Sequence, residues 1–137
     1  MKKIVKEITL SSKPESIIEV ESFVEDLSSR YNVEDDVFGN MIISITEAVN
    51  NAIIHGNKRD SSKSITIIES VEDSPHKLLC IKIKDEGTGF DYNNLPDPTS
   101  PENIIMIGGR GVYLIKQLAD YVIFNDEGNS IELQFRV

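Results

Sequence analysis

After Gly56-Asn57 the hydrophobic period of this chain changes from a helical pattern to a strand pattern, and that change restricts the folds open to the chain. Between residues 14 and 57, apolar residues recur every three to four positions, which predicts two amphipathic helices that end near Tyr31-Asn32 and Gly56-Asn57. In Ser64–Val71 and Lys77–Lys84, alternation and β-branched runs replace that period and predict an antiparallel hairpin. Helices followed by paired strands favour a layered α+β fold.

The remaining segments complete that layered fold. Lys3–Leu10 is β-leaning and is predicted to be an edge strand, and Val112–Tyr121 is predicted to be a third helix. Tyr121–Asn125 and Ser130–Val137 are predicted to form a closing hairpin. Residues 90–109 have no sustained period and several prolines, as in a lid or a disordered segment. We expect one domain over residues 1–137: a two-layer sandwich with a mixed, mostly antiparallel sheet and helices on one face.

Composition narrows the class of protein. The chain has 137 residues, 39% apolar and 27% charged, which suits one soluble domain with a real core. Its apolar runs are too short to span a bilayer and its N-terminus lacks a signal-peptide segment, so we expect a cytoplasmic protein without membrane contact. The single cysteine, Cys80, excludes an internal disulfide and lies in an apolar run typical of a core.

The net charge of −9 bears on the partners of the protein. A surface this negative argues against direct binding to nucleic acid, which requires a basic footprint. It favours a protein partner with a basic patch. A phosphate ligand would need local help from backbone N–H groups, a metal ion or a few placed cations.

Polar residues four apart mark the end of the second predicted helix. Glu47, Asn51 and His55 are spaced so that an α-helix would put them on one face. An amide oxygen is a hard ligand for Mg²⁺, and a carboxylate can accept a proton from an attacking hydroxyl group. Alone, this pattern is more typical of a solvated helix face.

Two glycine-rich segments follow. Asp85-Glu86-Gly87-Thr88-Gly89 comes directly after a predicted strand, where glycines let the backbone approach a ligand and Asp85 could accept a hydrogen bond from an exocyclic amine. By itself, this segment is more typical of a simple strand-exit turn.

The second segment, Gly108-Gly109-Arg110-Gly111, opens the third predicted helix. Free N–H groups of a first helical turn form an anion site, and Arg110 adds a fixed positive charge. The alternative is a flexible loop before a helix. The segment is neither a P-loop nor a dinucleotide fingerprint, because the sequence context of both is missing.

In this order, the three segments resemble the N, G1 and G2 boxes of the GHKL ATPase superfamily, in particular the small anti-sigma factor serine/threonine kinases of bacterial partner-switching systems. The boxes correspond to residues 47–56, 85–90 and 109–115, and the resemblance covers nearly the whole chain. It implies the GHKL (Bergerat) ATP-binding fold, with ATP and Mg²⁺ bound. The three boxes together are more specific for an ATP site than for kinase activity.

The resemblance also implies residue roles. Glu47 would be the general base or would orient the substrate hydroxyl, and Asn51 would hold Mg²⁺. Asp85 would recognise the adenine amino group. The other nucleotide contacts would come from four glycines, one arginine and a histidine that lines the site: Gly87, Gly89, Gly109, Gly111, Arg110 and His55.

For partners, the resemblance implies a sigma factor or related regulator that the domain sequesters, a STAS-domain antagonist that it phosphorylates, and a homodimer. Two other readings stay open. One is a nucleotide-dependent binding module without phosphotransfer, although such a module would not need Glu47. The other is an ATP-binding domain that works only with a second subunit, like a detached histidine-kinase catalytic domain. The predicted edge elements at both ends weigh against that fragment.

Overall fold

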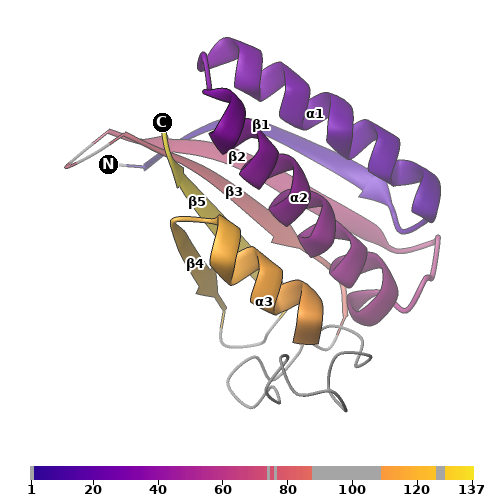
Figure 1. Cartoon of the computed structure of the whole chain (residues 1–137). Coiled ribbons are helices and arrows are strands. Elements are labelled where there is room, and N and C mark those ends of the chain that lie inside the picture. Colours follow the sequence, from indigo (N-terminus) through magenta and orange to yellow (C-terminus); the bar gives the residue numbers. More distant parts are fainter. Residues whose placement is uncertain (1, 74, 76, 88–108, 126–128) are drawn as a thin grey trace.

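Three helices cover one face of a five-stranded sheet (Figure 1). The computed structural model describes residues 2–73, 75, 77–87, 109–125 and 129–137. The strand order is β1-β2-β3-β5-β4, and all four pairings between described strands are antiparallel. In chain order the elements are β1 (Lys2–Ser11), the short 3₁₀ turn η1 (Pro14–Ser16), α1 (Ile17–Arg30), α2 (Asp35–Asn51), the π turn η2 (Ala52–Gly56), β2 (Ser64–Glu72), β3 (Leu78–Lys84), α3 (Gly109–Leu118), β4 (Tyr121–Phe124) and β5 (Ser130–Arg136).

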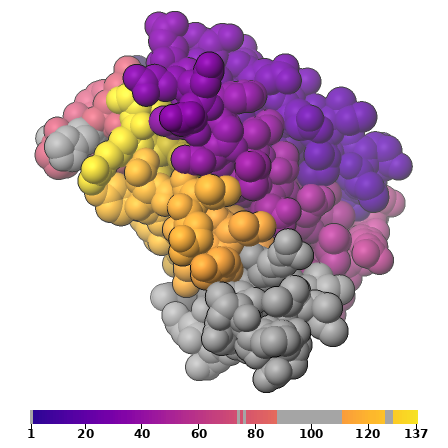
Figure 2. Space-filling model, viewed as in Figure 1, coloured from indigo at the N-terminus to yellow at the C-terminus, as the bar shows by residue number. Residues whose placement is uncertain are grey.

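The core lies between the helical layer and the sheet. Helix α1 buries Val20, Phe23, Val24 and Leu27 at helical spacing, and alternate residues of each central strand face the same layer. Figure 2 shows the helical face as a closed surface over α1 and α2, with α3 beside them. The predicted α+β sandwich is therefore confirmed, and β1 is an edge strand as expected.

The third helix begins at Gly109, within the glycine segment predicted to open it and three residues before the apolar pattern that begins at Val112. It ends at Leu118, before the predicted end at Tyr121, which opens β4 as the predicted closing hairpin required. Glycines can occupy a first helical turn because the N–H groups there need no partner within the helix. At the other end, the Asp120 N–H donates to the Gln134 carbonyl at 3.0 Å, which draws the chain out of the helix and into the sheet.

The end of the long central helix is also not regular. After Asn51, the hydrogen bonding changes to a π turn, in which the Asn57 N–H donates to the Ala52 carbonyl five residues back at 2.8 Å. A π turn holds more residues than an α turn, so His55 follows Asn51 by slightly less than one turn of η2. That His55 shares one face with Glu47 and Asn51 stays a prediction.

Cys80 is fully buried, as its apolar surroundings predicted. Burial, reinforced by the nearby Glu132 carboxylate, raises the pKa of the Cys80 thiol to about 11. The thiol is protonated at neutral pH, which suits a packing residue and not a nucleophile.

One described helical stretch, Asp35–Gly56, is long and apolar enough to cross a membrane by length and composition alone. In this fold it is the central element of the helical layer and packs on the sheet and on both neighbouring helices (Figure 1). Core helices of soluble proteins meet the same criterion, so this stretch is weak evidence for a membrane span.

A buried carboxylate joins α1 to the sheet. Glu69 on β2 has no exposed surface, and its two oxygens accept hydrogen bonds from the Arg30 guanidinium at 2.9 and 2.6 Å. The Tyr31 hydroxyl donates a third, at 2.8 Å. These three hydrogen bonds offset the free-energy cost of removing the Glu69 carboxylate from water. That cost would remain if a partner were removed.

Arg30→Met is therefore expected to lower the free energy of unfolding by about 3 kcal/mol, because it leaves the Glu69 charge buried. Equilibrium urea unfolding measures the loss. Lys6→Met is the matched control, since Lys6 and Asp26 form an exposed ion pair at 3.9 Å and should change stability by less than about 0.5 kcal/mol. Equal effects of the two substitutions would contradict this role of Glu69.

Candidate functional site

The end of α2 meets the first turn of α3, and this junction brings two of the three sequence motifs together. Gly111 faces α2 so closely that a Cβ atom at this position would lie 2.9 Å from Asn51 Nδ2 and 3.2 Å from Glu47 Oε2. Glu47 and Asn51 are one α-helical turn apart and both are half-buried. The carboxylate and the carboxamide therefore lie together against the start of α3.

The first turn of α3 adds backbone donors to this junction. Gly109, Arg110 and Gly111 are its first three residues, so their N–H groups have no partner within the helix. Together with the helix dipole, such groups favour an anion. A side chain at Gly111 would fill the space beside Asn51 and Glu47. The arrangement can hold a phosphate next to a carboxylate and an amide.

The third motif forms a separate wall at the end of β3. Asp85 directly follows the strand and is 8% exposed. Its own N–H donates to the Asn129 carbonyl at 2.9 Å, and its Oδ1 accepts the Gly87 N–H at 2.7 Å. Burial raises the pKa of Asp85, although the Gly87 N–H and the Lys63 charge oppose the shift. The carboxylate is thus held in place with acceptor capacity left over.

Two glycines make room for this carboxylate. A Cβ atom at Gly56 would overlap the Asp85 carboxylate, and one at Gly87 would overlap the Gly56 carbonyl and lie 2.9 Å from Asp85 Oδ1. Gly56 ends η2, so the helical stretch that carries Glu47 and Asn51 also forms the wall around Asp85. The N and G1 segments are therefore in direct contact.

The structure brings together five of the predicted site residues in two contacts: Glu47 and Asn51 against Gly111, and Asp85 with Gly87 at Gly56. Gly109 and Arg110 lie in the first turn of α3. Gly89 and residues 90–108 of the segment predicted to be a lid or disordered fall outside the described residues, and its last residue, Gly109, opens α3. His55 is half-buried in η2, where burial, and secondly the positive charge of Arg59, lower its pKa. Its contact with a nucleotide stays a prediction.

Two residues of this region were not predicted to have site roles. Gly56 and Asn57 were interpreted as a helix stop, yet Gly56 contacts Asp85, and the Asn57 side chain accepts the Glu86 N–H at 2.7 Å. A glycine beside a motif can indicate close backbone approach as well as a helix end. The sequence offered that signal at Gly56, but nothing comparable at Asn57.

The donor set at Asn51 fits a single Mg²⁺ ion shared with phosphate oxygens. Among the described residues, no cluster of three or more His, Cys, Asp or Glu side chains could hold a metal ion without outside ligands. One amide oxygen beside a carboxylate and the start of a helix is instead a partial set, which phosphate and water would complete.

Gly87→Ala is expected to lower the free energy of unfolding by about 2 kcal/mol, because the added methyl group meets the Gly56 backbone, which cannot rotate away. The matched control is Gly39→Ala in α2, where nothing lies within 4 Å of the added Cβ and stability should rise by about 0.5–1 kcal/mol. Urea unfolding of both variants checks the pair. A neutral Gly87→Ala would contradict the close packing of the N and G1 segments.

Comparisons with known sequences and structures find proteins similar to this chain. The serine-protein kinase RsbW of Bacillus cereus (strain Q1) is 29% identical over 132 residues, covering 91% of this chain and 80% of that relative. RsbW of Listeria monocytogenes serovar 1/2a is 26% identical over 131 residues, covering 90% and 82%. A crystal structure of RsbU and RsbW domains from Mycobacterium tuberculosis aligns with a TM-score of 0.60 at 14% identity. It covers 96% of this chain, which spans about a third (32%) of that longer chain, and shows the shared fold.

The family itself follows from a family model. The model of the histidine kinase-like ATPase domain matches residues 10–135, which include the N, G1 and G2 segments, the three helices and the strands β2, β3 and β4. The resemblance to ATPases of this type is thereby confirmed, and the chain belongs to the histidine kinase-like ATPase domain family.

Proposed function

We propose that this protein is an ATP-dependent serine/threonine protein kinase that acts as an anti-sigma factor. The observation that carries the proposal is the position of the Glu47 carboxylate beside Asn51 and the first turn of α3. A domain that only bound ATP would need the anion site and the adenine wall, but it would not need a carboxylate at that place. The similarity to serine-protein kinases supports the same activity.

Glu47 would act on the substrate hydroxyl. As the hydroxyl oxygen bonds to the γ-phosphorus, Glu47 would accept the hydroxyl proton, and the bond to the β–γ bridging oxygen would break to release ADP. The first-turn N–H groups of α3 would stabilise charge on the transferred group. Arg110, second in that turn, would add positive charge.

Asp85 would select the base of the nucleotide. Its free acceptor capacity suits the 6-amino group of adenine, and Gly56 and Gly87 leave room for the Asp85 carboxylate to be held in that position. The proposed role of Gly87 in the close approach of the base comes from the family resemblance. Gly89 and His55 are proposed as further contacts. Asn51 would hold Mg²⁺, which supplies neutralising charge between the phosphates when bound.

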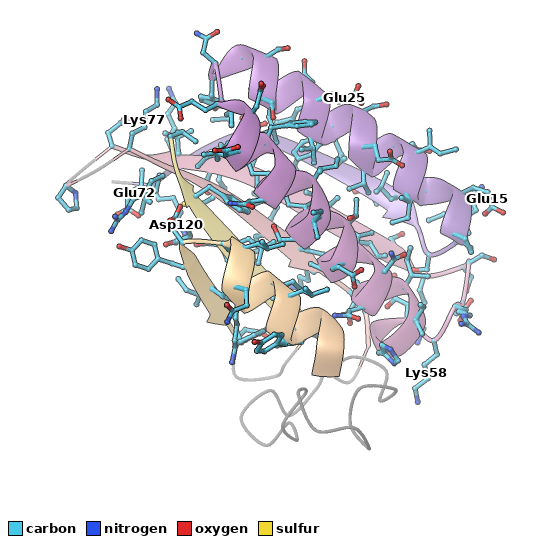
Figure 3. The ribbon with its side chains drawn as sticks, in the orientation of Figure 1. Glu15, Glu25, Lys58, Glu72, Lys77 and Asp120 are labelled. Carbon is cyan, nitrogen blue, oxygen red and sulfur yellow. The ribbon has the colours of Figure 1, made fainter. Side chains whose placement is uncertain are left out.

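The proposed protein partners are a sigma factor or related regulator, which the kinase would sequester, and a STAS-domain antagonist, which it would phosphorylate. The acidic surface supports a partner with a basic patch: Glu15 on η1 and Glu25 on α1 project away from the sheet (Figure 3), and the whole chain carries a net charge of −9. We propose the cytoplasm as the setting and no direct contact with nucleic acid or membrane.

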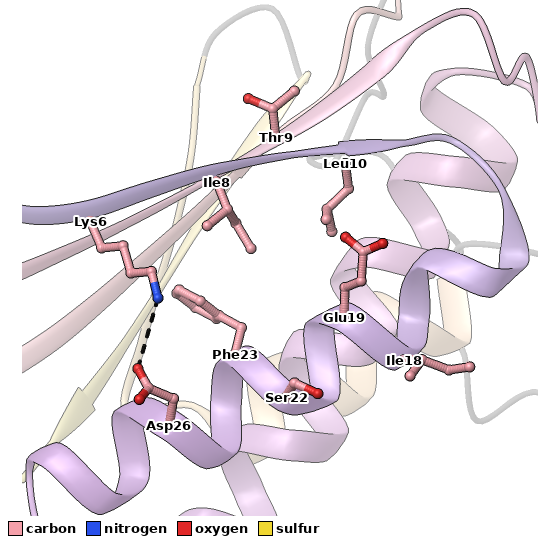
Figure 4. Close-up of a pocket in the computed structure, with 9 residues that line it drawn as sticks. All are labelled: Lys6, Ile8, Thr9, Leu10, Ile18, Glu19, Ser22, Phe23 and Asp26. Atoms are coloured by element: carbon pink, nitrogen blue, oxygen red, sulfur yellow. Dashed lines mark ion pairs between the residues drawn. The ribbon is translucent and has the colours of Figure 1, made fainter.

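A homodimer is also proposed, with the outer side of β1 and α1 as its surface. A groove of about 600 Å³ runs between these elements and is lined by Ile8, Leu10, Ile18 and Phe23, with the Lys6–Asp26 ion pair at one end (Figure 4). Ile4, Val5 and Ile18 are exposed on the same two elements. None of the predicted site residues lines this groove, so a partner there would leave the nucleotide site open.

The deciding experiment is phosphotransfer from Mg²⁺-ATP to a STAS-domain protein encoded beside this gene, read by intact mass. We expect a gain of one phosphate on the STAS protein, on a serine or threonine. No gain, in samples where ATP and partner binding are both demonstrated, would overturn the kinase proposal in favour of a nucleotide-dependent binding module.

A further inference from the structure

Asn57 is a fully buried polar residue next to the adenine wall, the group of residues formed by Gly56, Asp85 and Gly87. It directly follows Gly56 and has no exposed surface. Its Nδ2 donates to Ser12 Oγ and, at 3.0 Å, to the Ser64 carbonyl, while its Oδ1 accepts the Glu86 N–H at 2.7 Å. One carboxamide thus joins the segment after β1, the start of β2 and the segment after β3.

The contact to Glu86 bears on the chemistry of the site. The Glu86 N–H belongs to the peptide bond that follows Asp85, so a hydrogen bond to it fixes the backbone on which the Asp85 side chain is mounted. The Asp85 N–H on the other side is held by the Asn129 carbonyl at 2.9 Å. Asp85 is therefore held by backbone hydrogen bonds on both sides.

The simpler role for a polar residue at a helix end is to donate a hydrogen bond to a backbone carbonyl of the last helical turn. Here the Asn57 backbone N–H already does that through the Ala52 carbonyl. The side chain makes its hydrogen bonds to the segments flanking the strands instead. Both amide donor contacts, to Ser12 and Ser64, fix the carboxamide so that its oxygen faces Glu86. The side chain is therefore available for positioning Asp85.

We propose that Asn57 is a positioning residue that sets the selectivity of the site for the 6-amino group of adenine by fixing the Asp85 backbone. This inference rests on the proposed adenine contact of Asp85. A carboxylate discriminates best when it is held at hydrogen-bond distance before the ligand arrives, and a small displacement weakens that one contact without affecting the phosphates.

The test compares two nucleotides that differ only at that position: ATP, and purine riboside triphosphate, which lacks the 6-amino group. Dissociation constants are measured by calorimetry for the wild type and for Asn57→Ala, Asn57→Asp, Asp85→Asn and Tyr31→Phe. The Asp variant keeps an acceptor for the Glu86 N–H. Tyr31→Phe is the control, because it deletes one hydrogen bond to buried Glu69 away from this wall.

We expect the wild type and Tyr31→Phe to bind ATP about tenfold more tightly than the purine riboside analogue. Asn57→Ala should reduce that ratio at least about fivefold while its affinity for the analogue stays within about twofold of wild type. Asn57→Asp should recover part of the ratio. If Asn57→Ala does not fold, Asn57→Ser, which is too short to reach Glu86, takes its place with the same expectation.

The outcomes separate this inference from the proposed function. A wild-type ratio near one would overturn the adenine contact of Asp85 and the inference with it. A high wild-type ratio that falls in Asp85→Asn but stays unchanged in Asn57→Ala would overturn the role of Asn57 alone. Equal loss of both affinities in Asn57→Ala would also overturn it, because a merely structural residue would act on both nucleotides alike.

Discussion

Glu47→Ala is expected to lower the rate of phosphotransfer by about two to four orders of magnitude, the usual contribution of a positioned general base. ATP affinity should change little, because Glu47 is proposed to act on the hydroxyl that attacks the nucleotide. Single-turnover phosphotransfer, with ATP binding measured separately, distinguishes the two quantities. The expected pattern is a fall in kcat with an unchanged dissociation constant for ATP.

The control for Glu47→Ala is a carboxylate on the same helix. Asp36 is exposed in the first turn of α2, at the opposite end of that helix from Glu47 and Asn51. Asp36→Ala should therefore keep wild-type kinetics. Glu47→Gln should behave like Glu47→Ala, since the amide keeps the shape but cannot accept the proton as a carboxylate does. Undiminished phosphotransfer by either Glu47 variant would rule out its role as base.

Asp85→Asn is expected to weaken ATP binding by about ten- to a hundredfold. In the native site, Oδ1 already accepts the Gly87 N–H, which leaves the other oxygen for the adenine amine. Asparagine can serve the Gly87 N–H with its one oxygen, but it then presents an NH₂ donor to the amine, which is also a donor. Calorimetric titration with ATP measures the loss, and normal binding would exclude this adenine contact.

The same variant should be more stable than the wild type at neutral pH. Burial raises the pKa of Asp85 above its ordinary value of 3.8, so the folded state binds the proton more tightly than the unfolded state does. The stability of the wild type therefore falls as pH rises from about 3.8 through the raised pKa. A neutral asparagine avoids this loss, so the advantage of Asp85→Asn in urea unfolding should appear as pH rises and be smallest in acid.

If Asp85→Asn were both less stable and unchanged in ATP affinity, the carboxylate would be a structural residue. The expected opposite signs, weaker binding with greater stability, are typical of a site that keeps an unfavourable buried charge for its function.

The fold was predictable from the sequence wherever one local pattern decided the structure. The helical period in Ile17–Arg30 and the alternation in Ser64–Glu72 each indicated the element that formed. The start of α3 was predicted from the glycine motif and not from periodicity, because Gly109-Arg110-Gly111 has low helix propensity and lies against α2, while the apolar pattern begins only at Val112.

The site was partly predictable for a similar reason. Glu47, Asn51 and Asp85 stand in patterns whose spacing indicates their neighbours, and the structure places the first two together. The roles of Gly56 and Asn57 depend on contacts with residues about thirty positions away, such as Asp85 and Glu86. No periodicity within one segment reports such a contact. The π turn over Ala52–Gly56 was equally invisible to a rule based on four-residue spacing.

That π turn has a consequence for the length of the chain at this point. Ala52–Gly56 stands between Asn51, which meets α3, and Gly56, which meets Asp85. A π turn closes over about one residue more than an α turn, so removing one residue would let this stretch close as an ordinary α turn with little rotation of Gly56 relative to Asn51. Inserting one residue would instead exceed what the π turn absorbs and would turn Gly56 by about 100° relative to Asn51. An insertion here would therefore separate the proposed phosphate and base contacts, whereas a deletion would leave them close to their present places.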